Sequence, residues 1–161
     1  MKNRTTIERK SERELVVSRI INGPSRLVFE AWTKPELFKR WWVPKSSGLT
    51  LVSYEADIRT GGKYRLVFRH GDSEPMAFFG RYIEVTPHSR VVWTNEENHE
   101  GGEVSTVTFE DKGAETLVVL TELYQTKEAL DAAMAAGALA VSDESYDQLE
   151  ELLATLGSTA S

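Results

Sequence analysis

The sequence predicts an α+β fold in which a curved antiparallel sheet of six to seven strands packs around a long C-terminal helix. Short apolar runs with the alternation typical of strands fill residues 49–124, and polar or glycine-containing turns separate them. Residues 126–156 instead show apolar residues at helical spacing. Consecutive strands followed by a helix favour an antiparallel sheet over alternating βαβ units.

Before the main run of strands, the chain is expected to form one strand and two short helices. The strand is expected at Glu14–Ile21, and the Asn-Gly-Pro turn after it cannot continue a ladder. Apolar residues at helical spacing within residues 25–32 predict the first helix. Lys34-Pro35 breaks that helix, because the residue before proline avoids the α region; Pro35 then begins a second helix, which Pro44 ends. Two such short apolar helices need a covering partner, and a sheet is expected.

Six further strands are expected before residue 125. Tyr64, Leu66 and Phe68 should share one face of their strand, with Lys63, Arg65 and Arg69 on the other. Val52 and Tyr54 should share a face of the preceding strand. The six ranges are Leu49–Arg59, Lys63–Arg69, Met76–Val85, Arg90–Asn95, Val104–Glu110 and Glu115–Tyr124.

A single domain is expected at residues 14–157, because 161 residues suffice to bury a core and no linker interrupts them. Residues 1–13 are mostly polar and form either a polar arm or an extra edge strand, and residues 158–161 are read as a loose tail. Alanine and glycine dominate residues 129–140. These small side chains either leave room for a cavity between helix and sheet or allow close contact between the two.

The composition excludes several classes of partner. The formal net charge of −6 argues against nucleic acid or an anionic membrane. No run approaches about 18 apolar residues, and the N-terminus lacks the apolar region of a secretory signal, so no membrane insertion and a cytoplasmic location are expected. The absence of cysteine excludes disulfides and thiolate ligands. The three histidines lack metal-site spacing and are read as surface residues, so neither metal nor cofactor is expected.

Four motifs occur in order across residues 14–156. They are N-G-P-x-x-x-V-x-x-A-W-T-x-P-x-x-x-x-x-W-W-x-P at 22–44, D-I-R-x-G-G at 57–62, G-R-Y-I-E-V-T-P-x-x-R-V-V-W-T at 80–94, and S-Y-D-Q-L-E-E-L-L at 145–153. With this order and spacing, the chain resembles the START-like superfamily, which has the helix-grip fold. Within the superfamily it is most similar to the small domains of the heat-shock protein ATPase activator homologue family.

The resemblance implies a hydrophobic cavity between the sheet and the long helix, which binds an apolar or aromatic small molecule without a cofactor. A cyclase- or hydrolase-type enzyme that uses the same cavity is the second interpretation, and a protein-interaction module is the third. In the eukaryotic cochaperone the domain accompanies a separate chaperone-binding domain. These 161 residues are read as one domain, so a chaperone-activating role is not expected.

The candidate ligand contacts are mainly aromatic, because an indole or phenol on a cavity wall needs a hydrogen-bond partner that a ligand can supply. Arg81 shares a strand with Phe79 and Ile83, and strict alternation places it on their apolar face, where it could bind a carboxylate. A bulge or an outward tilt would make it a surface arginine. No nucleophile with a neighbouring base is recognised, so no catalytic residue is assigned. The cavity candidates are Trp42, Tyr64, Leu66, Phe79, Arg81, Trp93, Met134 and Val141.

Other prominent residues have structural interpretations. Trp32 and Trp41 are expected to anchor the core, because large aromatic side chains contribute much of the buried apolar area in a domain of this size. Asp57 and Arg59 share a strand face just before a Gly-Gly turn. We expect an ion pair between them to fix that turn.

Overall fold

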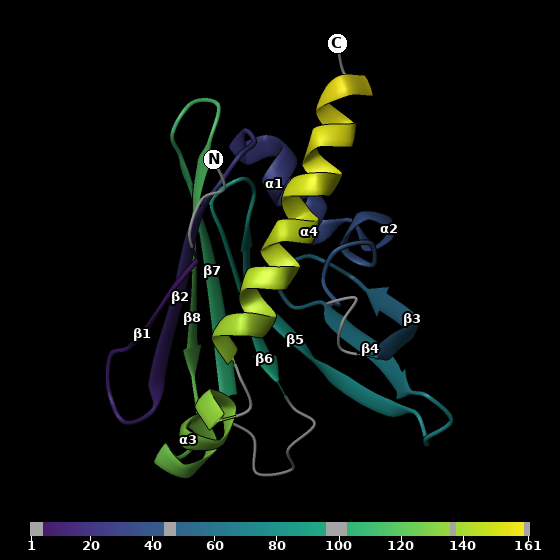
Figure 1. Cartoon of the computed structure of the whole chain (residues 1–161), viewed down its shortest axis with the longest axis vertical. Helices are drawn as coiled ribbons and strands as arrows, with labels where there is room; N and C mark the ends of the chain where they lie inside the picture. The colour runs from purple at the N-terminus through teal and green to yellow at the C-terminus, as the bar shows by residue number, and fades with distance from the viewer. Residues whose placement is uncertain (1–4, 44–47, 96–102, 136–137, 160–161) are drawn as a thin grey trace.

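The computed structural model describes residues 5–43, 48–95, 103–135 and 138–159 (Figure 1). Most predicted strands are found within one or two residues of their expected ends, whereas the helices differ more. In chain order the elements are β1 (Thr6–Arg9), β2 (Glu14–Ile21), α1 (Ser25–Thr33), α2 (Pro35–Phe38), β3 (Leu49–Ala56), β4 (Lys63–His70), β5 (Met76–Thr86), β6 (Arg90–Asn95), β7 (Glu103–Asp111), β8 (Thr116–Leu123), α3 (Lys127–Ala135) and α4 (Ala138–Thr159).

The strands form one antiparallel sheet in the order β1-β2-β8-β7-β6-β5-β4-β3. The α+β class and the antiparallel sheet are therefore confirmed, but the described strands number eight rather than six or seven. The additional strand is β1, in which Thr6 pairs with Ser18 and Arg9 with Leu15 of β2. The edge-strand interpretation of the polar arm is thus correct for residues 6–9.

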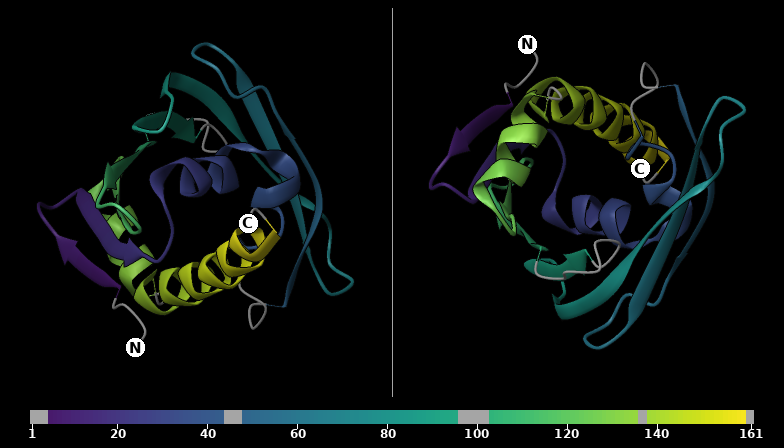
Figure 2. Two further views of the ribbon diagram at one scale, coloured as in Figure 1. Left: turned by 90° about the horizontal axis from the view of Figure 1, so that it is seen from above. Right: turned by 90° about the horizontal axis from the view of Figure 1, so that it is seen from below.

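The sheet curves strongly, and α4 closes its open side, so that sheet and helix surround α1 and α2 (Figure 2). We call the face toward these helices the concave face. The apolar side of α4 consists of Leu149, Leu152 and Leu153, which are all buried, and α4 packs against α1 and β2. The predicted helical spacing in this segment therefore marks the face that joins the core.

The C-terminal helical region differs from the single long helix that we predicted. Its described residues form two helices, α3 and α4, and residues 136–137 between them lie outside the described part of the chain. Thr126 caps α3, since its hydroxyl accepts a hydrogen bond from the backbone N–H of Ala129 at 3.0 Å. α4 runs to Thr159, past the stop expected at Gly157. No helix among the described residues, α4 included, has the length and apolar character needed to cross a membrane.

Candidate functional site

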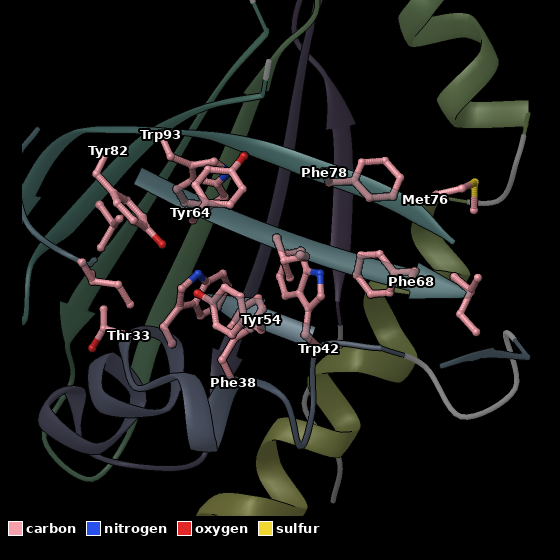
Figure 3. A pocket seen from close by; sticks show the side chains of 15 residues that line it. Thr33, Phe38, Trp42, Tyr54, Tyr64, Phe68, Met76, Phe78, Tyr82 and Trp93 are labelled. Carbon is pink, nitrogen blue, oxygen red and sulfur yellow. The ribbon is translucent and has the colours of Figure 1, made fainter. Parts of the chain in front are cut away.

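A cavity of about 320 Å³ lies between the concave face of β3–β6 and the segment that contains α1, α2 and Trp42 (Figure 3). This volume falls at the lower end of the range found for small-molecule sites, about 300–1,000 Å³. The lining is mostly apolar and aromatic. It consists of Trp32, Thr33, Phe38, Trp42, Leu49, Tyr54, Ile58, Tyr64, Leu66, Phe68, Met76, Phe78, Tyr82, Val91 and Trp93.

The two adjacent tryptophans after α2 have different surroundings. Trp41 is fully buried, and its indole N–H donates to the carbonyl of Ala31 at 2.9 Å. Trp42 instead lines the cavity and stacks on Phe38, with ring centroids 4.8 Å apart. Trp32 packs edge-on against both tryptophans, buried as the sequence predicts, and also reaches the cavity. Trp41 therefore anchors the segment that presents Trp42 to the cavity.

Helix α4 holds this segment in place from behind. The side-chain amide of Gln148 donates to the carbonyls of Trp41 and Val43, both at 2.9 Å, and the hydroxyl of Ser145 donates to the carbonyl of Trp42 at 2.8 Å. Helix α2 ends at Phe38 rather than near Pro44, although the backbone N–H of Trp42 still donates to the Phe38 carbonyl at 3.2 Å. No described side chain of α3 or α4 lines the cavity. The described wall of the cavity therefore comes from α1, α2, Trp42 and the strands, and α4 supports that wall from behind.

The polar atoms of the cavity wall are hydroxyl and indole groups. Tyr64 donates to the carbonyl of Thr94 at 2.6 Å, and the hydroxyls of Tyr54 and Tyr82 are hydrogen-bonded to each other. Burial raises the pKa of both Tyr54 and Tyr82, which keeps these phenols neutral. None of the described residues that line the cavity carries a charged side chain. The wall is therefore suited to the apolar or aromatic part of a molecule.

Gly80 is required for the close packing of β5 against β6 beside this wall. A Cβ atom at Gly80 would lie 2.0 Å from the Thr94 carbonyl oxygen and 2.9 Å from the Tyr64 ring. The Thr94 oxygen is the acceptor of the Tyr64 hydroxyl. The glycine therefore leaves the space in which Tyr64 takes its position in the cavity.

Four of the predicted site residues meet at this cavity, namely Trp42, Tyr64, Leu66 and Trp93. Phe79 and Arg81 do not, because the phase that we predicted for β5 is wrong. Strand β5 pairs with β4 so that Gly80, Phe78 and Met76 lie beside the inward-facing Tyr64, Leu66 and Phe68. Phe79 and Arg81 consequently lie on the opposite, convex face, where they line an open hollow. A bulge between Tyr82 and Glu84 changes the phase again before Val85.

Of the two candidates from the C-terminal region, Met134 does not line the cavity, and the position of Val141 is not tested. Met134 lies on α3 and is 39% exposed. The side chain of Val141, within α4, lies outside what the structure describes. Both were chosen on the expectation of one helix crossing the sheet, and the division into α3 and α4 removes that basis.

Several lining residues were missed because bulges hide the strand phase. A register shift between Leu51 and Ser53 leaves Val52 53% exposed, although Tyr54 lines the cavity. The expected shared face of Val52 and Tyr54 is therefore wrong. Phe78 and Met76 were missed for the reason given for β5. Pairing β5 with the cleanly alternating strand β4 would have identified them.

The remaining residues singled out from the sequence lie apart from the cavity. Arg59 Nε and Asp57 Oδ2 are 2.8 Å apart beside the Gly61-Gly62 turn, which confirms the predicted ion pair. His70 is the last residue of β4, and the ring of His88 packs edge-on against Phe29 with centroids 5.4 Å apart. His99 lies outside the described residues.

Glu122 is an acidic residue of the concave face that sequence reasoning did not single out. It lines a second, smaller hollow of about 120 Å³ and accepts a hydrogen bond from the hydroxyl of Tyr124 at 2.7 Å. Burial raises the pKa of its carboxyl above the ordinary value of 4.5, and the bond from Tyr124 opposes this only in part. The signal was present in the sequence, since Val118, Leu120 and Glu122 alternate in one phase.

We expect the change in unfolding free energy caused by Glu122→Gln to be more favourable at pH 7 than at pH 4. Because the pKa of Glu122 is raised in the folded state, the folded protein binds more protons than the unfolded chain above about pH 4.5. The unfolding free energy of the wild-type protein therefore falls as the pH rises toward the folded-state pKa. Glutamine does not ionise, so the variant does not show this fall. Urea denaturation of both proteins at the two pH values measures the effect. An equal difference in unfolding free energy at both would contradict it.

A curved antiparallel sheet, closed by a terminal helix around an apolar cavity, defines the helix-grip class of START-like domains. The chain belongs to the family described as Activator of Hsp90 ATPase homolog 1-like protein, whose model matches residues 22–154. This confirms the resemblance seen in the sequence motifs. A comparison with curated proteins finds no match.

Solved structures share the fold. A protein from Rhodobacter sphaeroides is 22% identical and has a TM-score of 0.86, with 94% of this chain and 99% of that chain covered. A Nitrosomonas europaea protein is 24% identical with a TM-score of 0.83, covering 93% and 99% of the two chains. An AHSA1-like protein from Aeromonas hydrophila is 21% identical with a TM-score of 0.68, covering 84% and 92%. At these identities the likeness establishes the fold alone.

Proposed function

We propose that this protein binds an apolar or aromatic small molecule in the cavity between α1–α2 and β3–β6. The observation that supports the proposal is the cavity wall, on which the described side chains are aromatic, aliphatic or hydroxyl-bearing and uncharged. Family membership is compatible with a ligand or with a protein partner, and an internal cavity favours a ligand. The cytoplasmic location expected from the sequence remains a prediction.

The energetics favour binding because apolar surface leaves water when it enters the cavity. Burial of apolar area contributes about 25 cal/mol per Å², so a bicyclic aromatic molecule gains several kcal/mol before its loss of freedom is counted. The wall is also held in position before a ligand arrives. The Trp41 indole is bonded to α1, and the carbonyls of residues 41–43 accept hydrogen bonds from α4, so little ordering is needed upon binding.

A neutral aromatic probe is therefore expected to raise the melting temperature. With 2-ethylnaphthalene at 100 times its Kd, a ligand of the native state alone stabilises by about 2.7 kcal/mol, or roughly 5–10 °C for a chain of this size. Inositol, a polar ring, serves as the control and should give no shift. Native mass spectrometry of freshly purified protein should in parallel reveal a retained small molecule. Neither a shift with neutral aromatics nor a retained molecule would contradict the proposal.

A further inference from the structure

The strand register aligns a row of side chains that leads from the cavity to Glu122. Tyr82 of β5 pairs with Trp93 of β6, Trp93 pairs with Ser105 of β7, and Ser105 pairs with Glu122 of β8. Paired residues of neighbouring strands point to the same face, so all four share the concave face. With strands about 4.8 Å apart, the row from Tyr82 to Glu122 spans roughly 14 Å.

The cavity and the smaller hollow lie next to each other along this row. We call the smaller hollow the Glu122 chamber; its lining residues are Trp42, Trp93, Val104, Ser105, Glu122, Leu123 and Tyr124. Trp42 and Trp93 line both spaces, so two indoles form the wall between them. A molecule that extends past these indoles would pass from apolar surroundings to a carboxyl group.

Among the described residues, no basic side chain forms an ion pair with Glu122, although an inward-facing acid usually has such a partner. An ionised carboxylate offers about four acceptor sites, and within the described part of the chain the hydroxyl of Tyr124 is the only hydrogen-bond donor that reaches this one. Arg19, the fully buried cation of the same face, is paired with acids of α4 instead. The other hydroxyl that interacts electrostatically with Glu122 belongs to Tyr146, whose pKa is raised and which stays neutral. Glu122 can therefore accept a cation from a ligand.

We propose that the Glu122 chamber is a subsite for an amino group, and that the ligand carries this group on an apolar or aromatic body that occupies the main cavity. The inference rests on the proposed binding function and specifies its ligand class. An ammonium supplies hydrogen-bond donors and a positive charge to Glu122. It also meets Trp42 and Trp93 on the way, and indole rings attract cations. An anionic group would meet carboxylate repulsion at the same place.

Two probes of nearly equal shape test this subsite. 2-Naphthylmethylamine is protonated at pH 7, and 2-ethylnaphthalene replaces its amino group by a methyl group. Their Kd values are measured by tryptophan fluorescence for the wild-type protein, Glu122→Gln and Glu55→Gln. Glu55 is an exposed acid of β3, so its variant makes the same change in net charge away from the chamber. We expect Glu122→Gln to weaken binding of the amine at least ten-fold and to change the Kd of 2-ethylnaphthalene less than two-fold. Glu55→Gln should alter neither.

The remaining outcomes separate the two proposals. If 2-ethylnaphthalene binds the wild-type protein but the amine does not, or if Glu122→Gln weakens neither probe, the subsite is overturned and the cavity proposal stands. An equal loss for both probes also overturns it, because the variant would then act on the cavity as a whole. If neither probe binds the wild-type protein, both proposals fail.

Discussion

An Arg19→Met variant should lose about 3 kcal/mol of unfolding free energy. The Arg19 side chain is fully buried on the concave face of β2, where it meets three acids of α4. Its guanidinium lies 3.4 Å from Asp143 Oδ1 and 2.9 Å from Asp147 Oδ1, and it also pairs with Glu150. Methionine fills similar space but leaves three neighbouring carboxylates without their shared cation. Because these carboxylates are partly exposed, we place the loss at the lower end of the range for broken buried pairs.

Arg26→Met provides the matched control for this variant. Arg26 forms an exposed pair with Glu30 on α1, with 3.7 Å between Nη1 and Oε1, and such pairs contribute less than about 1 kcal/mol. Guanidinium denaturation of both variants gives the comparison directly. If the two substitutions cost the same, the Arg19 cluster does not fix α4 against the sheet.

The second large effect is expected from Ile58→Trp, which should weaken binding of 2-ethylnaphthalene at least ten-fold, or about 1.4 kcal/mol. Ile58 follows β3, lines the cavity and is only partly buried, so an indole at this position can enter the cavity without repacking the core. The space it fills is then lost to the ligand. The change is read as the Kd from a fluorescence or calorimetric titration.

Ile83→Trp makes the same substitution on the other side of the sheet. Ile83 is 51% exposed on β5 and does not line the cavity. Its variant should bind the probe like the wild-type protein. Equal affinities in both variants, with both folded, would mean that the probe sits elsewhere.

The strands and helices of this fold could be predicted because their apolar periodicity is strong. Strand β4 shows why: Tyr64, Leu66 and Phe68 fall in one phase, most residues of the opposite phase are charged, and all three line the cavity. The phase of β3 and β5 was lost because each contains a bulge, and a single extra residue turns every later side chain to the other face. Gly80 adds to the error, since it occupies an inward position without showing an apolar side chain.

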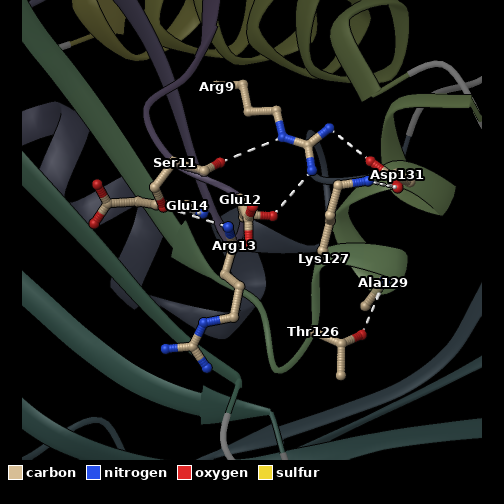
Figure 4. A network of polar contacts seen from close by, with 9 residues as sticks. All are labelled: Arg9, Ser11, Glu12, Arg13, Glu14, Thr126, Lys127, Ala129 and Asp131. Atoms are coloured by element: carbon tan, nitrogen blue, oxygen red, sulfur yellow. Dashed lines mark hydrogen bonds and ion pairs between the residues drawn. The ribbon is translucent and has the colours of Figure 1, made fainter.

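Long-range polar contacts explain why residues 6–9 form strand β1, which the composition of the N-terminal segment does not predict. Strand β1 is almost entirely polar, and it is fixed by Arg9, which ion-pairs with Asp131 of α3 at 2.6 Å and donates to the carbonyl of Glu12 at 2.9 Å (Figure 4). Lys127 holds the same aspartate at 3.0 Å. Arg9 and Asp131 are more than 100 positions apart in the chain, so nothing in the local pattern of residues 1–13 indicates that they pair.

The way in which α4 supports the cavity wall could not be predicted for a similar reason. Gln148 and Ser145 of α4 bond to backbone carbonyls of residues 41–43 and thereby hold α1, α2 and the tryptophans over the concave face. The helical spacing of apolar residues predicts which side of α4 is buried. It does not predict which backbone carbonyls the side-chain amide of Gln148 will contact. The aromatic candidates could be selected without this knowledge: Tyr64 and Trp93 by their type and strand phase, and Trp42 by its aromatic type alone.

Isotope-filtered nuclear Overhauser measurements on the labelled protein with unlabelled 2-ethylnaphthalene locate the bound molecule. The cavity between α1–α2 and β3–β6 predicts contacts from the naphthalene protons to Tyr64, Leu66 and Trp93. Contacts to Met134 on α3 or to Phe79 on the convex face, with none to these three, would contradict it.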